Sequence, residues 1–271
     1  MLGRSMLVLA AVLALNAFAL ADVWDVGTDN DNDSGSDNEI VHGLNQVHDL
    51  AAQSGGTVMD VDWFTFRHPS ARSFEILVEG LTGDVSNGTT SPSVQIIDSD
   101  GITVSDDSEP VTNFGVARSL RTYSGLLPGS TPGYYNSFVR VSNPACGLSC
   151  AANDQYRIRA YETTLTLPRF NNVGSQLTVL ILQNSTGKTV MGTAHAMSGS
   201  GTLLGSITFA IAPYATLVTN LSTALGGILN GQSGSLIIPH TAPYGVLAGK
   251  GVALEPSTGF TFDTALSHVA N

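Results

Sequence analysis

The chain has 271 residues, of which 42% are apolar and only 12% charged, and its 22 acidic residues outnumber 11 basic ones. The apolar content excludes a disordered acidic tail, the low charged fraction excludes a coiled coil, and the net charge of −11 disfavours a nucleic-acid partner. Its 29 glycines follow no three-residue period, so the composition is typical of a turn-rich β protein and not of collagen.

Residues 1–21 have the pattern of a secretory signal peptide. Arg4 supplies a positive charge, an apolar run extends from Met6 to Ala17, and Ala19-Leu20-Ala21 forms a small-residue cleavage site. The run is too short, and the segment after it too acidic, for a membrane anchor. We therefore expect an exported protein, secreted or at the cell surface with the periplasm as the alternative, and no transmembrane segment after cleavage.

The next segment, residues 22–39, is an acidic leader with seven carboxylates and no Lys or Arg. Three of its aspartates alternate along the chain, and a fourth follows a turn that contains glycine. Such hard oxygen ligands suit calcium, although an EF-hand loop is excluded because its sixth and twelfth positions would be Ser34 and Ile40. Two interpretations stay open: an irregular calcium site, or a flexible solvated leader without a specific ligand. The candidate ligands are Asp29, Asp31, Asp33 and Asp37.

The charge changes abruptly along the chain and predicts two domains. Residues 22–167 contain 20 acidic and 7 basic side chains, whereas residues 168–271 contain only 2 acidic and 3 basic ones. A shift of this size is typical of a domain boundary, and Thr166–Asn172 is the natural position for it. We expect one domain at 40–167 and a second at 168–271.

Both halves are predicted to consist of strands. The first half contains five short segments in which apolar and polar residues alternate, and turn residues such as Asn87-Gly88 separate them. The second half contains five short apolar or alternating runs. The alternating positions are Phe64/Phe66, Phe74/Ile76/Val78, Val94/Ile96, Val139/Val141 and Tyr156/Ile158/Ala160, and the later runs are 177–182, 189–197, 206–212, 236–239 and 246–254. This pattern predicts an all-β fold of two consecutive β-sandwiches.

Five motifs of the first half occur in the order found in one known family. They are Asp60–Phe66, Phe74–Val78, Val94–Gly101, Tyr134–Ser142 and Asp154–Arg159. Residues 38–162 thereby resemble the bacterial pre-peptidase C-terminal domain, a jelly-roll-like β-sandwich appended to many secreted enzymes. The resemblance implies an accessory, non-catalytic module and supplies no catalytic residues. Related sandwiches on secreted collagenases bind calcium near their N-terminal segment, which implies the same for residues 22–39.

The second half is similar to a module that follows such sandwiches in secreted bacterial proteins of unassigned role. The similarity implies secretion and an Ig-like β-sandwich but no activity. The similar residues are Arg169–Asn172, Val179–Asn184, Pro243–Gly245, Lys250–Pro256 and Gly259–Asp263.

Cys146 and Cys150 are the two cysteines of the chain. In an exported protein such a pair is expected to form a disulfide. A metal site would need two further ligands nearby, where the sequence offers only Asp154. A redox centre normally has two intervening residues, whereas this pair has three.

Motifs for catalysis are missing. The chain has no His-Glu-x-x-His and no Gly-x-Ser-x-Gly, and Gly187-Lys-Thr189 lacks the leading glycine of a phosphate loop. His195 lies in a strand-like run, where we expect a core or interface histidine and not a general base. We therefore expect that the protein is not an enzyme.

Three classes of function remain after these exclusions. We favour a secreted, non-catalytic binding or surface-associated accessory protein, stabilised by calcium if the leader binds that ion. The alternatives are a structural component of a cell-surface assembly, favoured by the almost uncharged second half, and a secreted hydrolase with an unrecognised site. The expected partner is an extracellular polysaccharide, a protein or the cell envelope, and the sequence does not decide among these.

Overall fold

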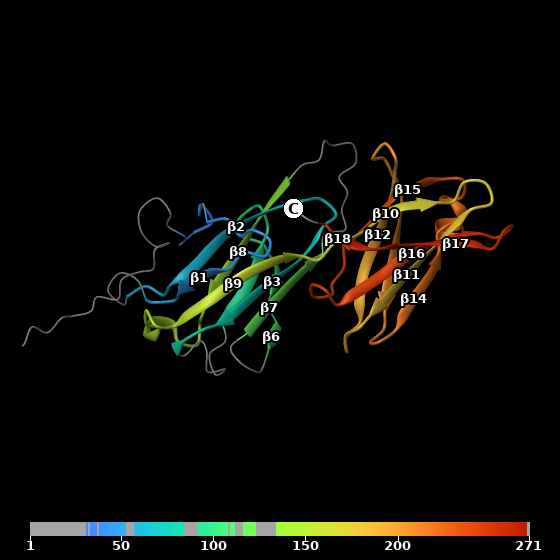
Figure 1. Ribbon diagram of the computed structural model, residues 1–271. Coiled ribbons are helices and arrows are strands. Elements are labelled where there is room, and N and C mark those ends of the chain that lie inside the picture. The colour runs from blue at the N-terminus through green and yellow to red at the C-terminus, as the bar shows by residue number, and fades with distance from the viewer. Residues whose placement is uncertain are drawn as a thin grey trace, which may run out of the picture.

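The computed structural model describes residues 31, 33–36, 38–52, 57–83, 92–107, 109–111, 116–122 and 134–269, and the predicted signal peptide lies outside them. These residues form antiparallel sheets in two lobes that lie end to end, and none of them is in an α-helix (Figure 1). The predicted all-β sandwich fold is confirmed. Because the described residues contain no α-helix, they also contain none that is long and apolar enough to span a membrane.

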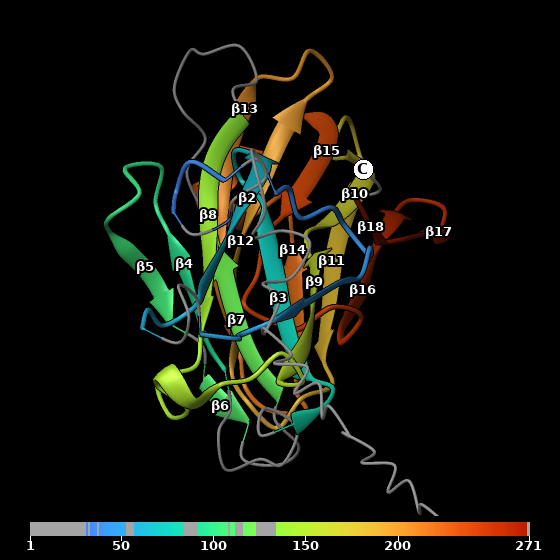
Figure 2. The same cartoon turned by 90° about the vertical axis from the view of Figure 1, so that its left-hand side faces the viewer.

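The first lobe consists of two sheets that pack face to face. One has the spatial order β1 (Gln46–Asp49), β9 (Gln155–Glu162), β3 (Ser73–Gly80), β7 (Val116–Thr122) and β6 (Glu109–Val111). The other has the order β2 (Val61–Pro69), β8 (Tyr134–Ser142), β4 (Ser93–Ile97) and β5 (Val104–Asp107). Figure 2 views the molecule from the end of this lobe.

Alternating side chains from these two sheets form one core. Phe64 and Val139 on one sheet belong to the same buried cluster as Ile76 and Ile158 on the other, and all four are fully buried. All the alternating apolar positions expected from the sequence of this lobe are at most 6% exposed. Period-two alternation identified these strands correctly because each strand has one face in the core.

The second lobe repeats this plan with a separate core. Its first sheet has the order β13 (Leu203–Ile211), β12 (Val190–Ser198), β15 (Ser233–Ile238), β10 (Leu165–Asn171) and β18 (Ser267–His268). Its second sheet has the order β14 (Thr216–Asn220), β11 (Leu177–Asn184), β16 (Leu247–Glu255) and β17 (Phe260–Ala265). Leu167 and Phe170 from the first sheet pack in the same core as Leu180 and Leu182 from the second.

The chain passes between the two pairs of sheets at Thr163 and Thr164, and the segment proposed as the boundary is largely strand β10. Polar and aromatic contacts join the lobes here. The backbone N–H of His240 donates to Ser73 Oγ at 3.0 Å, and the backbone N–H of Tyr244 donates to Glu75 Oε2 at 2.9 Å. The ring of Tyr244 stacks on that of Tyr161 with centroids 5.0 Å apart. The junction is therefore a structured contact.

The predicted disulfide between Cys146 and Cys150 is confirmed. It closes a short loop after β8, with the two Cα atoms 5.2 Å apart. The Asn143 side chain holds the loop by accepting the backbone N–H of Ala145 at 3.1 Å, and Cys150 is buried in the core of the first lobe. The disulfide therefore fastens a surface loop to that core.

Replacing both cysteines by serine should lower the free energy of unfolding by about 2 kcal/mol, because the unfolded chain would lose the constraint of a very short ring. Chemical denaturation of the double variant beside the parent measures this difference. Intact mass after alkylation without reductant should show no label on the parent protein. Two labelled thiols in freshly exported protein would contradict the bond.

Candidate functional site

Part of the acidic leader runs alongside strand β2. The backbone N–H of Trp63 donates to the carbonyl of Asp31 at 2.6 Å, and that of Thr65 donates to the carbonyl of Asn38 at 2.7 Å. The hydroxyl of Thr65 also donates to the carbonyl of Ser36 at 2.7 Å. These bonds place Asp31 beside Trp63, near the start of β2.

Strand β2 adds a carboxylate to the same region. Its even-numbered residues face the core, and Asp62 continues the row of Phe64 and Phe66 with an exposure of only 1%. From the facing sheet, His48 of β1 is paired in register with Tyr156 of β9. The His48 ring lies edge-on to Phe64 with centroids 4.8 Å apart. Regular strand geometry thus brings polar groups into the end of an apolar core.

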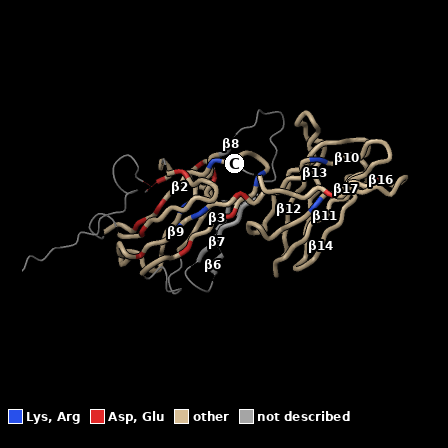
Figure 3. Tube along the Cα trace, in the orientation of Figure 1, with Lys and Arg blue, Asp and Glu red and all other residues tan. Residues whose placement is uncertain are grey.

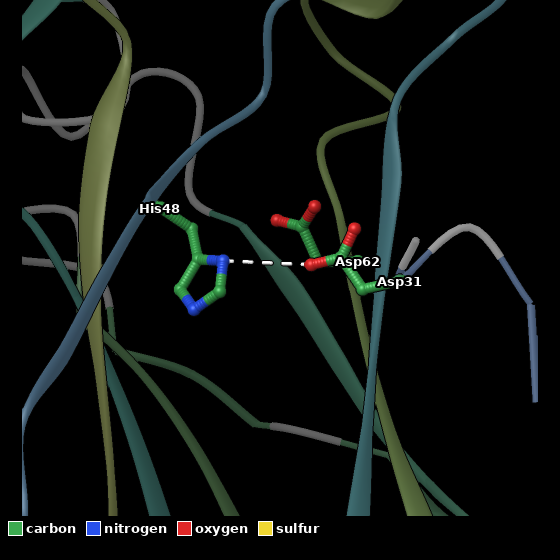
Figure 4. Close-up of side chains that lie close together, drawn as sticks. All are labelled: Asp31, His48 and Asp62. Carbon is green, nitrogen blue, oxygen red and sulfur yellow. Dashed lines mark ion pairs between the residues drawn. The ribbon is translucent and has the colours of Figure 1, made fainter. Parts of the chain in front are cut away.

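Asp31, His48 and Asp62 form a buried three-residue cluster (Figure 4). One oxygen from each carboxylate and one ring nitrogen all lie within 4.8 Å of one another. His48 Nδ1 is 3.5 Å from Asp31 Oδ2. None of the three residues is more than 1% exposed. We call this group the Asp31 cluster.

The carboxylate of Asp31 is the most unusual member. Neither of its oxygens accepts a hydrogen bond from a residue that the structure describes, and its ion pair there is the long contact to His48. A fully buried carboxylate is costly unless it is paired and hydrogen-bonded. Asp31 therefore lacks most of the compensation that a buried charge requires.

A tyrosine hydroxyl borders the cluster. Tyr156 donates a hydrogen bond to Asp62 Oδ2. Burial raises the pKa of Tyr156 well above its usual value, and the negative charges of Asp62, Asp31 and Asp60 raise it further. Tyr156 is thus held as a neutral donor, and it neutralises none of the negative charge around it.

The donor set of the Asp31 cluster suits a divalent cation. Calcium prefers six to eight oxygen ligands, whereas two carboxylates with an imidazole are a set that zinc and manganese accept readily. The carboxylates therefore fit calcium, but His48 fits a softer ion better. Since the three side chains are inaccessible, the cluster offers no room for a substrate.

Of the four sequence-predicted ligands, Asp31 and Asp33 are among the described residues, and these two are separated. Asp31 lies in the cluster, whereas Asp33 is exposed and its Oδ1 accepts the backbone N–H of Gly35 at 2.7 Å in a turn. Asp29 and Asp37 lie outside the described residues. Sequence reasoning missed His48 and Asp62. For Asp62 a signal existed, because an aspartate in phase with Phe64 and Phe66 must face inward.

His195 lies where the sequence analysis expected it, in the second lobe and 3% exposed. Its Nδ1 is 2.8 Å from Ser206 Oγ on the neighbouring strand β13, and burial lowers its pKa. A histidine in this position joins two strands. Its surroundings give it the character of a core residue.

A scan against models of protein families finds none that matches this chain, and a search of curated proteins finds no match. The resemblance of residues 38–162 to the pre-peptidase C-terminal domain therefore stays a prediction from their motifs.

Proposed function

We propose that this chain is a secreted, non-catalytic binding or surface-associated accessory protein whose acidic leader is fastened to the first sandwich by a divalent cation. The proposal of a cation site rests on Asp31, a fully buried carboxylate whose oxygens accept no hydrogen bond from the described residues. A cation at the Asp31 cluster would supply the missing positive charge. It would also join the leader to strands β1 and β2.

Calcium and zinc are distinguished by the part that His48 plays. If calcium binds, Asp31 and Asp62 supply oxygens, and His48 is a neighbour whose replacement has little effect on affinity. If zinc binds, the His48 nitrogen is a ligand, and its loss weakens binding strongly. The resemblance to calcium-binding sandwiches favours calcium, and the chemistry of His48 favours zinc.

A non-catalytic role is supported by the burial of the Asp31 cluster, which among the described residues combines two carboxylates with a histidine. A hydrolase needs such groups at a surface that a substrate can reach, and the members of the Asp31 cluster are at most 1% exposed. A structural role in a surface assembly is the second candidate. It is favoured by the exposed apolar side chains Val218, Phe260 and Phe262 on the edge strands of the second lobe.

We expect calcium or zinc to raise the melting temperature of the mature protein relative to chelator. A ligand that binds only the native state at a hundred times its Kd adds about 2.7 kcal/mol of stability. For a chain of this size that corresponds to roughly 5–10 °C. A thermal melt in chelator, in millimolar calcium and in micromolar zinc measures the shift.

The control for this experiment lies in the same leader. Asp31→Asn should abolish the shift and should also raise the melting temperature in chelator, because it removes a buried uncompensated charge. Asp33→Asn, an identical change at an exposed aspartate, should preserve the shift. His48→Gln should preserve a calcium shift and remove a zinc shift. If neither metal changes the melting temperature of the mature protein, or if the two aspartate variants shift equally, the proposed cation site is wrong.

A further inference from the structure

The second lobe has a cleft at one open side of its sandwich. Strand β18 pairs only with Leu165 and Thr166 of β10, so the remainder of β10 has no strand on that side among the described residues. Opposite it lies β17, the edge strand of the facing sheet. A cavity of about 210 Å³ occupies the space between β10, β16 and β17. The cleft exists because β18 is too short to close the sandwich.

The cleft is lined by small residues of β16 at its base and by large aromatic residues of β17 at its side. Gly251 and Ala253 of β16 form the floor, and Ala253 is paired in register with Phe262 of β17. A Cβ atom at Gly251 would lie 2.7 Å from Leu167 Cδ2, so a larger residue there would have to displace the core. Phe260 and Phe262 both line the cavity, and they form its aromatic wall.

Both phenylalanines are largely in water. Phe260 is 68% exposed and Phe262 is 61% exposed. Aromatic side chains contribute most to stability when their ring faces are buried, so these two rings contribute little to the folding of the lobe. Two residues apart on one strand, they present their rings on the same face at a spacing of about 7 Å. Exposed aromatic rings beside a cavity are typical of a binding surface.

Polar side chains surround this aromatic wall. Arg169, Asn171, Gln176 and Glu255 line the same cavity. The guanidinium of Arg169 has no hydrogen bond or ion pair with the residues that the structure describes, whereas Glu255 accepts hydroxyl hydrogen bonds from Ser175 at 2.9 Å and from Ser257 at 2.7 Å. The rim therefore offers a free planar donor and a fixed carboxylate acceptor.

Charge is rare in this lobe, which makes its position informative. No Asp, Glu, Lys or Arg occurs between Lys188 and Lys250. Figure 3 shows a largely uncharged second lobe whose few charged positions include β10 and the β16–β17 pair. Lys250 and Asp263 there neutralise each other in an ion pair of 2.5 Å. Arg169 and Glu255 are left at the cleft, where their charges are available to a ligand.

We infer that this cleft binds a saccharide chain, with Phe260 and Phe262 as the stacking surface and Arg169, Asn171, Gln176 and Glu255 as the hydrogen-bonding rim. The inference rests on the proposed binding function and gives it a ligand class and a site. A sugar ring has an apolar face of C–H groups and a circumference of hydroxyls. It therefore needs a flat aromatic surface beside planar donors and acceptors, which this cleft combines.

Other occupants fit the cleft less well. A peptide strand added to the open edge of β17 would use the backbone of that strand and would need neither Arg169 nor Gln176. A lipid chain would need an enclosed apolar cavity, and the polar rim opposes its entry. A saccharide uses the aromatic wall and the polar rim together.

Isothermal titration of the mature protein, residues 22–271, with cellohexaose, chitohexaose and hexagalacturonate tests the inference. We expect at least one of the three to bind with one site per chain. Phe260→Ala combined with Phe262→Ala should weaken that binding at least tenfold, because the stacking surface is lost. Arg169→Met keeps the aliphatic stem and should also weaken binding, most strongly for hexagalacturonate, whose carboxylates pair with guanidinium.

Val218→Ala is the matched control, since it removes an exposed apolar side chain from β14 at the other edge of the same sheet. It should leave saccharide binding unchanged. Absence of binding to all three probes, or binding that the double phenylalanine variant leaves intact, would overturn the inference. Dimerisation that the same double variant abolishes, without saccharide binding, would also overturn it and assign the face to strand pairing. The thermal melt with calcium or zinc tests the cation site of the first lobe, and its result does not depend on whether the second lobe binds a saccharide.

Discussion

Replacing Asn184 by alanine should destabilise the second lobe by roughly 3 kcal/mol or more, the largest effect that we expect from a single polar side chain. Asn184 is fully buried at the end of β11. Its Nδ2 lies within hydrogen-bond distance of three backbone carbonyls, at 2.7 Å from Lys188, 3.1 Å from Ile211 and 3.0 Å from Ala212. Its Oδ1 accepts the backbone N–H of Thr186 at 2.9 Å. One side chain thus satisfies the backbone of two turns.

The expected cost follows from the groups that would be left behind. Alanine would remove the side-chain donor to the buried carbonyl of Ile211 and the acceptor of the Thr186 N–H, and each such unsatisfied group costs about 1–3 kcal/mol. The carbonyls of Lys188 and Ala212 keep other donors, the Thr186 hydroxyl at 2.9 Å and the Ala215 N–H at 3.1 Å. Asn184→Asp is the informative second variant, because it keeps the shape and the acceptor but places an unpaired charge against carbonyl oxygens. Chemical denaturation of both variants beside the parent measures the differences. A loss below 1 kcal/mol in both would show that water replaces the side chain.

Asn184 also shows how far sequence reasoning reaches. The segment Asn184–Lys188, which lacks the pattern of a phosphate loop, is the turn between β11 and β12. Because these two strands lie in different sheets, the segment is not the turn of a β-hairpin. Asparagine is typical of turns because its side chain bonds to the backbone two residues ahead, as it does here to Thr186. The contacts to Ile211 and Ala212 could not be predicted, because they depend on how distant strands pack.

The strands that were missed lack the expected hydrophobic pattern. Strand β1 contains Gln46, His48 and Asp49, and two of these polar residues are buried because they join the Asp31 cluster or the backbone around it. Strand β14 lies in an uncharged stretch in which each face combines threonine with one apolar residue, Val218 on one face and Leu217 on the other, so alternation carries no signal. Buried polar groups and uniform composition are where a period-two rule fails.

Of the three residues in the Asp31 cluster, the sequence predicted only Asp31, for a related reason. Asp31 and Asp33 are equivalent in the sequence, two residues apart in an acidic segment. The structure separates them because the carbonyl of Asp31 pairs with Trp63, whereas the carbonyl of Asp33 accepts the backbone N–H of Ser36 and begins a turn. Which aspartate is buried therefore depends on long-range pairing with β2. The sequence could predict that aspartates of the leader form the site, but it could not predict which of them is buried there.

The junction between the lobes should make the protein sensitive to acid through His240. Its side chain lies at the interface, where His240 Nδ1 accepts the backbone N–H of Ala242 at 3.1 Å. Burial, followed by the charge of His268, lowers the pKa of His240 to about 4, although the backbone of Thr163 partly opposes this. His268 itself has a lowered pKa, caused first by burial and also by the charge of His42.

Other ionisable groups also lie at this junction. They are Tyr161, Tyr244, Glu75, Glu162 and Arg72, and the last two are ion-paired at 3.4 Å.

The direction of the pH dependence follows from comparing the folded and unfolded chains. An unfolded histidine takes up a proton near pH 6.5, whereas folded His240 takes it up only near pH 4. Between these values the unfolded state binds more protons, so the free energy of unfolding falls as the pH decreases. The loss from His240 alone should reach about 3 kcal/mol by pH 4, because each unit of pKa difference corresponds to about 1.4 kcal/mol.

His240→Asn tests this assignment, since asparagine retains an acceptor for the Ala242 N–H but does not titrate. Chemical unfolding at pH 7.5, 6, 5 and 4 should show a parent that loses stability more steeply than the variant, with the difference developing between pH 6.5 and pH 4. His268→Asn is the control at the same junction; because its ring is less buried, that variant should flatten the dependence by a smaller amount. If the parent and His240→Asn lose stability in parallel over this range, the acid sensitivity belongs to other groups, and the neutral imidazole of His240 is not what holds the junction together.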